Sequence, residues 1–279
     1  MNTPLTEPST GHQPSGPKTI SPTIIAVSLK LYFDVPRTRS WCEEVAAIAH
    51  THPAIIDGTT ELLVLPSVVA LAAATEAMAG TPVRIGAQDL FHEDRGAFTG
   101  AVSGTDLREV GCTYVEVGHL ERRTVFGDDD RIVALKTRAA WRNDLIPLLC
   151  IGETRKDTTH ASIVECMRQL DSALPEDLRL SATVLVAYEP AWAIGASRPA
   201  DSAHVRAVVS RVRTWLATHR PGLTARVIYG GSAGVGQLTE LGDVVDGLFL
   251  GRFAHDTTAL AAILDEQTRP TMSQSTGEP

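Results

Sequence analysis

Three residues of very different chemistry stand at the ends of apolar runs: Lys30 closes IIAVSLK, His119 closes YVEVGH, and Glu189 comes near the end of VLVAYEP. An ionised carboxylate at the end of a buried strand costs desolvation free energy unless another group makes use of it. A carboxylate can take up a proton, an imidazole can relay one, and an ammonium stabilises developing negative charge. Together these residues could catalyse a proton transfer, provided that the fold brings them to one place.

Apolar runs recur eight times and alternate with segments of helical spacing. The runs are IIAVSLK, LLVLP, VRIGAQD, YVEVGH, IPLLCIGE, VLVAYEP, RVIYGG and GLFLGR. The helical segments are Arg37–His50, Ser67–Met78, Asp128–Arg142, Ala161–Ala173 and Asp201–His219, with Ser67 and Asp201 as N-caps. The pattern predicts an α/β fold, a closed (β/α)8 barrel in one domain, since the strand count matches and no GxGxxG follows the first run. An open doubly wound sheet is the alternative.

The polar residues that end these runs would share one face of such a barrel. Besides Lys30, His119 and Glu189, they are Gln88, Glu153, the pair Gly230 and Gly231, and the pair Gly251 and Arg252. The carboxyl ends of the strands form the catalytic face of a (β/α)8 barrel. Each residue alone has an ordinary structural explanation, but independent strand ends have no reason to agree. The set therefore predicts an active site at this rim.

The composition is that of an acidic globular protein. Its 279 residues are 43% hydrophobic and carry a formal net charge of −8, which argues against nonspecific binding to nucleic acid or to an anionic membrane. The four cysteines have neither metal-ligand nor disulfide spacing, so we expect reduced thiols and a cytoplasmic location. No run approaches the roughly 18 consecutive apolar residues that a membrane span needs.

The two ends of the chain differ from its middle. Residues 1–21 are rich in Pro, Ser, Thr and Gly and lack the apolar stretch of a secretory signal, so they are expected to form a disordered tail. Residues 266–279 have the same character and are expected to form a second disordered tail. The barrel domain is therefore expected to span residues 22–265.

Four motifs, in this order along the chain, resemble those of the triosephosphate isomerase family: EVGHLERRTVFG, LLCIGET, VAYEPAWAIGASRPA and IYGGSAG. GAQDLFHEDRGAFTG also resembles the third-loop region of that family. The match runs through nearly the whole predicted domain, and the ordered set is far more specific than any one motif. The resemblance implies a TIM barrel that isomerises a small phosphosugar through an enediolate. This chemistry requires neither a metal nor an organic cofactor.

The resemblance also implies roles for individual residues. Glu189 would be the base that moves a proton between neighbouring carbons, and His119 would be the electrophile that polarises the carbonyl group. Lys30 would stabilise the charge of the enediolate, with Glu121 orienting it as the family's glutamate does. A homodimer is implied as well, formed when the loop around Gly96–Gly100 of one copy inserts near the active site of the other.

The segment Ala191–Ala200 is interpreted as a lid over the substrate. It follows the rigid Pro190, carries the apolar Trp192 and Ile194, and contains Gly195, whose N–H could approach a phosphate closely. Because the protein is acidic overall, the phosphate has to be held by local groups. Backbone N–H groups after the last two strands could hold it, and the candidates are Gly230, Gly231, Ser232 and Gly251.

Several positions depart from the family's pattern. Ser28 stands two residues before Lys30, where the family has asparagine, and Arg252 stands where the family has the second of two glycines. Leu120 replaces a usual serine, and Ala101 replaces a glutamate that supports the dimer contact in the family. Base, electrophile and cation are kept while substrate-facing positions change. This combination indicates the same reaction on a different sugar.

The favoured reaction is the interconversion of erythrulose 1-phosphate and erythrose 4-phosphate, in tetritol or erythritol catabolism, which paralogues of the family are known to serve. Ser28 would leave room for one additional CHOH group and form a hydrogen bond with it. The alternative is triosephosphate isomerase itself, which converts dihydroxyacetone phosphate to glyceraldehyde 3-phosphate in glycolysis. A non-catalytic barrel that binds a phosphosugar ranks last, because Lys30, His119 and Glu189 are all present.

Overall fold

The computed structural model describes residues 22–176, 182–196 and 198–267 of the chain. Both predicted tails, apart from residues 266 and 267, lie outside the described residues, as does Ser197 of the predicted lid. Within the described ranges, no helix is long and apolar enough to cross a membrane.

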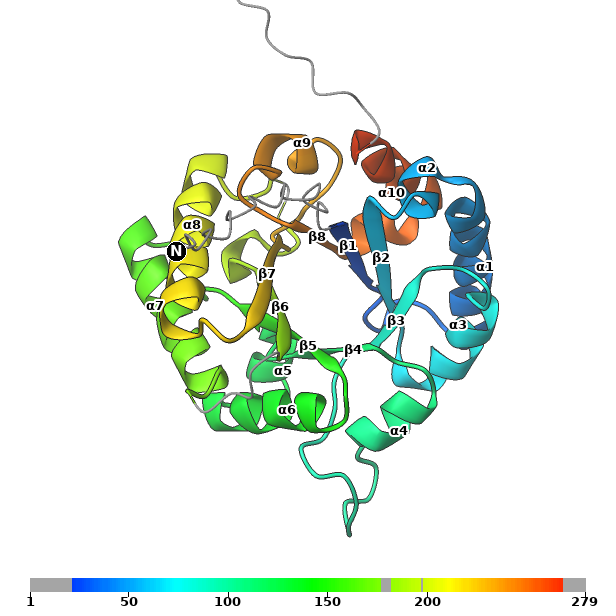
Figure 1. The fold of residues 1–279 in the computed structure, drawn as a ribbon, viewed down its shortest axis with the longest axis horizontal. Coiled ribbons are helices and arrows are strands. Elements are labelled where there is room, and N and C mark those ends of the chain that lie inside the picture. Colours follow the sequence, from blue (N-terminus) through cyan, green and yellow to red (C-terminus); the bar gives the residue numbers. More distant parts are fainter. Residues whose placement is uncertain (1–21, 177–181, 197, 268–279) are drawn as a thin grey trace, which may run out of the picture.

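Eight parallel strands form a closed barrel in which each strand pairs with the next and β8 pairs with β1 (Figure 1). This arrangement confirms the predicted (β/α)8 barrel and excludes the open sheet. The strands are β1 (Thr23–Ser28), β2 (Thr60–Leu65), β3 (Arg84–Ala87), β4 (Tyr114–Val117), β5 (Ile146–Ile151), β6 (Thr183–Tyr188), β7 (Thr224–Tyr229) and β8 (Gly247–Leu250).

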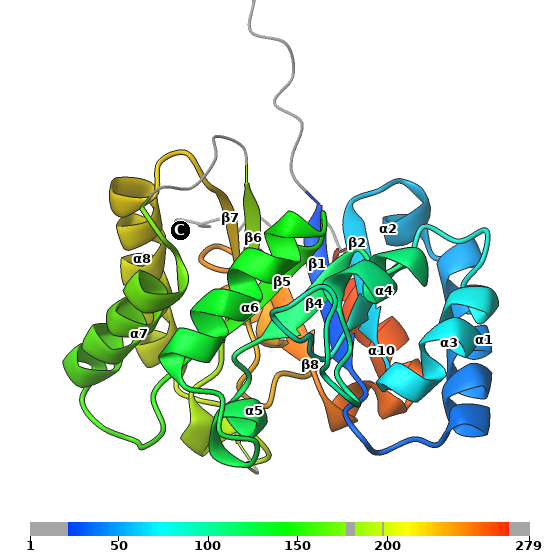
Figure 2. The same ribbon diagram turned by 90° about the horizontal axis from the view of Figure 1, so that it is seen from below.

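Helices surround the ring of strands and cover its outer face (Figures 1 and 2). The long ones coincide with predicted segments: α1 (Val35–Thr51), α6 (Asp130–Arg142), α7 (Thr159–Ala173) and α8 (Ser202–His219). The shorter α-helices are α2 (Pro53–Ile56), α3 (Leu71–Ala77), α4 (Gly104–Glu109), α5 (Leu120–Thr124), α9 (Gln237–Leu241) and α10 (Thr257–Leu264). Single 3-10 turns complete the connections at η1 (Val68–Ala70), η2 (Ala191–Ala193), η3 (Arg252–His255) and η4 (Asp265–Gln267).

The two predicted N-caps have different outcomes. Asp201 caps α8, because its Oδ1 accepts hydrogen bonds from the N–H groups of Ala203 and His204 at 3.0 and 3.3 Å. Ser67 precedes the 3-10 turn η1 and its side chain makes no capping bond, so this N-cap prediction was wrong. The N–H groups of a single 3-10 turn are arranged differently from those of an α-helix, and the α-helical part of this segment begins only at Leu71.

The described body extends two residues beyond the predicted domain boundary at residue 265. Residues 265–267 form η4, and the Glu266 carboxylate accepts hydrogen bonds from the N–H groups of Gly236 and Thr239 at 2.6 and 2.9 Å. Composition assigned Glu266 to the tail because a charged residue before a polar segment gives no signal of such a contact. The described body therefore includes Glu266 and Gln267.

Successive residues of each strand point alternately into the barrel and toward the helices. On β4, Val115 and Val117 belong to the apolar layer between strands and helices, whereas Tyr114 packs inside the barrel with Leu148 and Cys150. Alternation therefore directs the intervening residue of β4, Glu116, into the barrel, where it is only 3% exposed. The inner residues near the carboxyl ends of the strands form the bottom of the site described next.

Candidate active site

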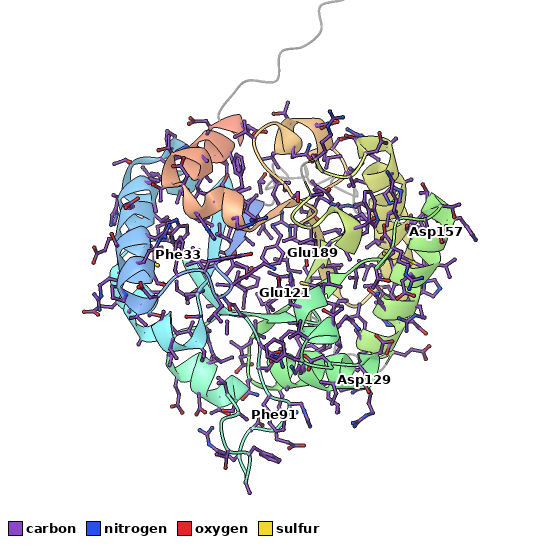
Figure 3. All side chains as sticks on the ribbon, turned by 180° about the vertical axis from the view of Figure 1, so that it is seen from behind. Phe33, Phe91, Glu121, Asp129, Asp157 and Glu189 are labelled. Carbon is purple, nitrogen blue, oxygen red and sulfur yellow. The ribbon has the colours of Figure 1, made fainter. Side chains whose placement is uncertain are left out.

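Lys30, His119 and Glu189 meet at the carboxyl ends of β1, β4 and β6, as the sequence led us to expect. Lys30 Nζ lies 3.0 Å from His119 Nε2, and Glu189 Oε2 lies 3.7 Å from the same nitrogen. Glu121 joins them through its Oε1, which lies 2.8 Å from Lys30 Nζ. Figure 3 shows Glu121 and Glu189 near the centre of the ring of helices, whereas the labelled Asp129 and Asp157 lie toward its outside.

His119 is fixed in one orientation by the helix that follows it. The residue is the N-cap of α5, and its Nδ1 accepts a hydrogen bond from the backbone N–H of Glu121 at 3.1 Å. A nitrogen that accepts a hydrogen bond carries no proton, so the ring is neutral and its proton resides on Nε2. Because an ammonium can only donate, the 3.0 Å approach of Lys30 Nζ to Nε2 is not a hydrogen bond in this tautomer, and both groups keep a proton to donate to an oxygen placed beside them. Figure 2 shows α5 at the rim opposite to the start of β1.

The backbone of Lys30 is held in an unusual conformation. Its φ of +49° lies in the left-handed region, which residues other than glycine rarely adopt. This backbone conformation is strained. Gln88, which follows β3, donates from Nε2 to the carbonyl oxygens of Lys30 and Leu65 at 3.0 and 2.9 Å. Gln88, a rim residue without an assigned role in the sequence, thereby stabilises the turn that presents Lys30.

Lys30 remains charged although it is largely removed from water. Burial acts to lower the pKa of Lys30, but the hydrogen bond to Glu121 and the nearby charges of Glu116, Glu189 and Glu121 raise it above its ordinary value. The carboxylates around the site therefore secure a permanent positive charge beside His119. Such a charge stabilises an oxyanion that forms next to it.

Glu189 has a buried carboxylate oxygen beside the imidazole of His119. Its side chain is 8% exposed, and its Oε2 is buried and accepts no hydrogen bond from any residue that the structure describes. Two glycines give it space, because a Cβ at Gly230 would lie 2.7 Å from Glu189 Cγ and one at Gly152 would lie 2.1 Å from Glu189 O. Gly230, expected to contact phosphate, thus has a second and directly observed reason to be glycine.

The segment after Glu189 is fastened to the rest of the rim by side chains at the ends of two strands, β5 and β7. Trp192 Nε1 donates to Glu153 Oε1 at 2.8 Å, and Ser232 Oγ donates to the carbonyl oxygen of Ala193 at 2.6 Å. Farther along the segment, the N–H of Ala200 donates to the Tyr229 hydroxyl at 3.1 Å. These bonds hold the segment over the site, which is the position that a closed lid would take.

A cavity of about 660 Å³ is lined by this segment and by Lys30, His119 and Glu189. Its lining contains every site residue expected from the sequence except Gly231: these are Ser28, Lys30, His119, Glu121, Glu189, Gly195, Gly230, Ser232, Gly251 and Arg252. Gly231 is directed elsewhere, since a Cβ on it would lie 2.5 Å from the Tyr229 hydroxyl, which donates to its carbonyl oxygen at 2.7 Å.

The end of the cavity away from His119 is suited to an anion. A Cβ placed on Gly195 would lie 3.4 Å from Arg252 Nη2. The guanidinium and the backbone of the segment therefore border the same space. Arg252 makes no ion pair within the described part of the chain and remains exposed. Among these residues, no group of three or more His, Cys, Asp or Glu side chains is arranged to hold a metal ion.

Sequence reasoning missed the buried carboxyl group of Glu116. Ser28 Oγ donates to Glu116 Oε2 at 3.2 Å, and Glu116 Oε1 lies 3.9 Å from His119 Nε2. Burial is the main influence that raises the pKa of Glu116 to about 7, and Glu189 adds to it while His119 and Lys30 oppose it. The signal in the sequence was an acidic residue inside the apolar run YVEV. Tyr229 was also missed, because only the fold brings its hydroxyl to Ala200.

The fold and this site define an isomerase of phosphorylated sugars, in which a carboxylate, an imidazole and an ammonium surround one cavity of a (β/α)8 barrel. Residues 23–267 match the family described as triosephosphate isomerase. The chain therefore belongs to the triosephosphate isomerase family, a family of isomerases that act on phosphorylated sugars.

Individual relatives cover most of the chain. It is 49% identical over 244 residues to L-erythrulose-1-phosphate isomerase of Pectobacterium atrosepticum, which covers 87% of this chain and 94% of the relative. It is 39% identical over 226 residues to triosephosphate isomerase of Moorella thermoacetica, covering 76% of this chain and 88% of that enzyme. The crystal structure of triosephosphate isomerase from Bartonella henselae superposes with a TM-score of 0.76 at 29% identity, covering 90% of this chain and 100% of that one.

Replacing Glu116 by glutamine should change how the stability of the protein depends on pH. The folded protein holds the Glu116 proton up to a pKa of about 7, and the unfolded chain releases it near the ordinary value of 4.5. Ionisation of Glu116 therefore lowers the free energy of unfolding as the pH rises through this window. Glu116→Gln cannot ionise, so it should become more stable relative to the unsubstituted protein, by up to about 3 kcal/mol.

Urea denaturation of both proteins at several values between about pH 5 and pH 8 measures this difference. The free energies of unfolding should diverge as the pH rises, with the glutamine variant the more stable of the two at the upper end. A difference that stays constant over the whole range would show that Glu116 does not titrate in this window.

Proposed function

We propose that this protein isomerises a four-carbon ketose phosphate, L-erythrulose 1-phosphate, with Glu189 as base. The observation that carries the proposal is the meeting of Glu189, His119 and Lys30 within 4 Å around one imidazole nitrogen. The choice of sugar is supported by the relative named L-erythrulose-1-phosphate isomerase, at 49% identity, against 39% for the triosephosphate isomerase of Moorella thermoacetica. It is also supported by the short Ser28 side chain beside the catalytic group.

The proposed reaction begins when Glu189 removes the proton from C3, the CHOH carbon next to the carbonyl. The electron pair of the C–H bond forms the C2–C3 double bond of an enediolate, and the carbonyl oxygen becomes negative. His119 Nε2–H and the Lys30 ammonium donate to the two substrate oxygens, and the imidazole relays a proton between them. Glu189 then returns its proton to C2. Glu121 supports the step by orienting Lys30, since Glu121 Oε1 lies 2.8 Å from Lys30 Nζ.

The position of the phosphate determines the product of this single step. On a triose phosphate, the proton transfer interconverts a ketose and an aldose. In erythrulose 1-phosphate the carbon that becomes the new carbonyl also carries a CH2OH group, so the product is a second ketose, erythrulose 4-phosphate. Erythrose 4-phosphate, expected from the sequence as the product, is reached from there by one further isomerisation. The same base and electrophile serve both the three-carbon and the four-carbon case.

We propose that the phosphate binds at the end of the cavity formed by Gly195, Ser232, Gly251 and Arg252, with Gly230 and Gly231 shaping the turn beneath it. Backbone N–H groups and one guanidinium there supply the positive potential that the acidic protein lacks overall. Segment 191–196 would exclude water while the enediolate exists, since open access would favour elimination of the phosphate. The bonds of Trp192 to Glu153 and of Ser232 to Ala193 support this position of the segment, and Tyr229 holds Ala200 just beyond it.

The proposed assembly is a homodimer in the cytoplasm. The loop between β3 and α4 projects away from the barrel (Figure 1), and its Phe98 is 43% exposed. Leu31 and Val69, at 88% and 75% exposed, offer apolar surface for a second copy. The free thiols of the four buried cysteines are compatible with a reducing compartment.

The choice between four-carbon and three-carbon substrates is tested by comparing kcat/KM of the purified protein for L-erythrulose 1-phosphate, dihydroxyacetone phosphate and glyceraldehyde 3-phosphate. The proposal predicts the largest kcat/KM for the erythrulose phosphate. A larger value for either triose phosphate would make the protein a triosephosphate isomerase. Failure of the folded protein to turn over any of the three would favour the phosphosugar-binding barrel that ranks last.

Replacing the base should abolish turnover without unfolding the barrel. Glu189→Gln removes the carboxylate proposed to abstract the carbon-bound proton, and general bases contribute about 10²- to 10⁴-fold to such steps, so kcat should fall at least about 100-fold. Glu165→Gln is the matched control, because that partly exposed carboxylate pairs with Arg168 on α7. Near-native kcat in Glu189→Gln, with the control also active, would overturn the assignment of the base.

A further inference from the structure

The barrel interior beside the cavity holds a carboxyl group that the mechanism above does not use. Glu116 is 3% exposed and lies within the barrel beneath His119. Its hydrogen-bond partners among the described residues are the Ser28 hydroxyl at 3.2 Å and the weakly donating Cys150 thiol at 4.0 Å. Both contacts are long, and a buried carboxyl with so few partners destabilises a fold relative to an apolar side chain. A role with the substrate would explain why the group is there.

The proposed reaction determines where the fourth carbon of the substrate must lie. C4 is attached to C3, the carbon from which Glu189 removes the proton, and the phosphate is attached at the other end of the molecule. C3 must therefore lie between Glu189 and His119, and C4 lies one bond farther from the phosphate. The terminal CH2OH group thus points toward the inner end of the cavity, away from Gly195 and Arg252.

Glu116 is a polar group of the barrel interior next to the imidazole of His119. Its Oε1 lies 3.9 Å from His119 Nε2, nearly the same distance that separates this nitrogen from Glu189 Oε2 at 3.7 Å. Ser28 and His119 line the phosphate-side cavity, which Glu116 does not line, and all three line a neighbouring cavity of about 680 Å³. Glu116 and Ser28 therefore lie close enough to the imidazole for a hydroxyl group on the carbon next to the reacting carbon to form a hydrogen bond with them.

We propose that Glu116 and Ser28 bind the terminal hydroxymethyl group of the four-carbon substrate, with a Glu116 carboxyl oxygen accepting the hydrogen bond of the C4 hydroxyl. This assignment rests on the function proposed above. It makes Glu116 a specificity-determining residue, since a triose phosphate has no group to satisfy the buried carboxyl. A site that hydrogen-bonds a substrate hydroxyl discriminates strongly against the analogue that lacks it.

The quantity that tests this assignment is a ratio: kcat/KM for L-erythrulose 1-phosphate divided by kcat/KM for dihydroxyacetone phosphate. Glu116→Leu keeps the bulk and removes both oxygens, so the ratio should fall about 10- to 100-fold. Glu116→Gln keeps an acceptor oxygen, so its ratio should fall less than that of the leucine variant. Melting temperatures of both variants show whether they are folded.

Glu61→Leu is the matched control for loss of a barrel carboxylate. Glu61 lies near the start of β2 and accepts a hydrogen bond from the Tyr114 hydroxyl at 2.7 Å, so it belongs to the opposite end of the barrel. Its substitution should leave the ratio unchanged. A fall in the ratio as large as that of Glu116→Leu would assign the effect to general loosening of the barrel and overturn the inference.

The outcomes separate this inference from the function on which it rests. A preference of the unsubstituted protein for the triose phosphate would contradict the proposed function, and the inference with it. A preference for the erythrulose phosphate, combined with an unchanged ratio in Glu116→Leu, would contradict the inference alone. If the unchanged ratio came with an equal loss of kcat/KM for both substrates, Glu116 would act through His119 and not on the fourth carbon.

Discussion

The rest of the site depends on the positive charge of the Lys30 ammonium group. Three carboxyl groups, those of Glu116, Glu121 and Glu189, surround the imidazole of His119, and without a cation their mutual repulsion would oppose this arrangement. Lys30 Nζ contacts both His119 and Glu121 directly. The cation is placed there by a left-handed backbone conformation that the Gln88 amide stabilises. The strained backbone of Lys30 therefore holds its ammonium group in one position.

From that charge the site extends in two directions with different chemistry. Toward the lid, backbone N–H groups, Ser232 and Arg252 border a space suited to a phosphate. Toward the inside of the barrel, Glu116 and Ser28 offer hydrogen-bonding atoms in a place that water scarcely reaches. The reacting carbons have to lie between these ends. Under the proposed function, the bound phosphate and the inner residues of the barrel would together select the length of the substrate, so the same base and electrophile would serve sugars of different size.

The sequence predicted the parts of this structure that follow from local patterns. Alternation of apolar runs with helical segments predicted the closed barrel, and polar residues at run ends predicted the shared rim that carries Lys30, His119 and Glu189. The hydroxyl of Tyr229, the cap expected at Ser67 and the turn at Glu266 could not be read in this way, because each depends on contacts between distant segments. Glu116 did leave a local signal, but its direction into the barrel became meaningful only with the register of β4.

The measurement that tests the central claim most directly is product analysis by NMR after reaction of L-erythrulose 1-phosphate in deuterated water. A single base that exchanges its proton with solvent should yield erythrulose 4-phosphate as the first product, with deuterium at C3, the carbon that was the original carbonyl. Detection of an aldehyde as the first product would contradict the account. So would a ketose product without deuterium at C3 under conditions in which the Glu189 carboxyl exchanges with solvent.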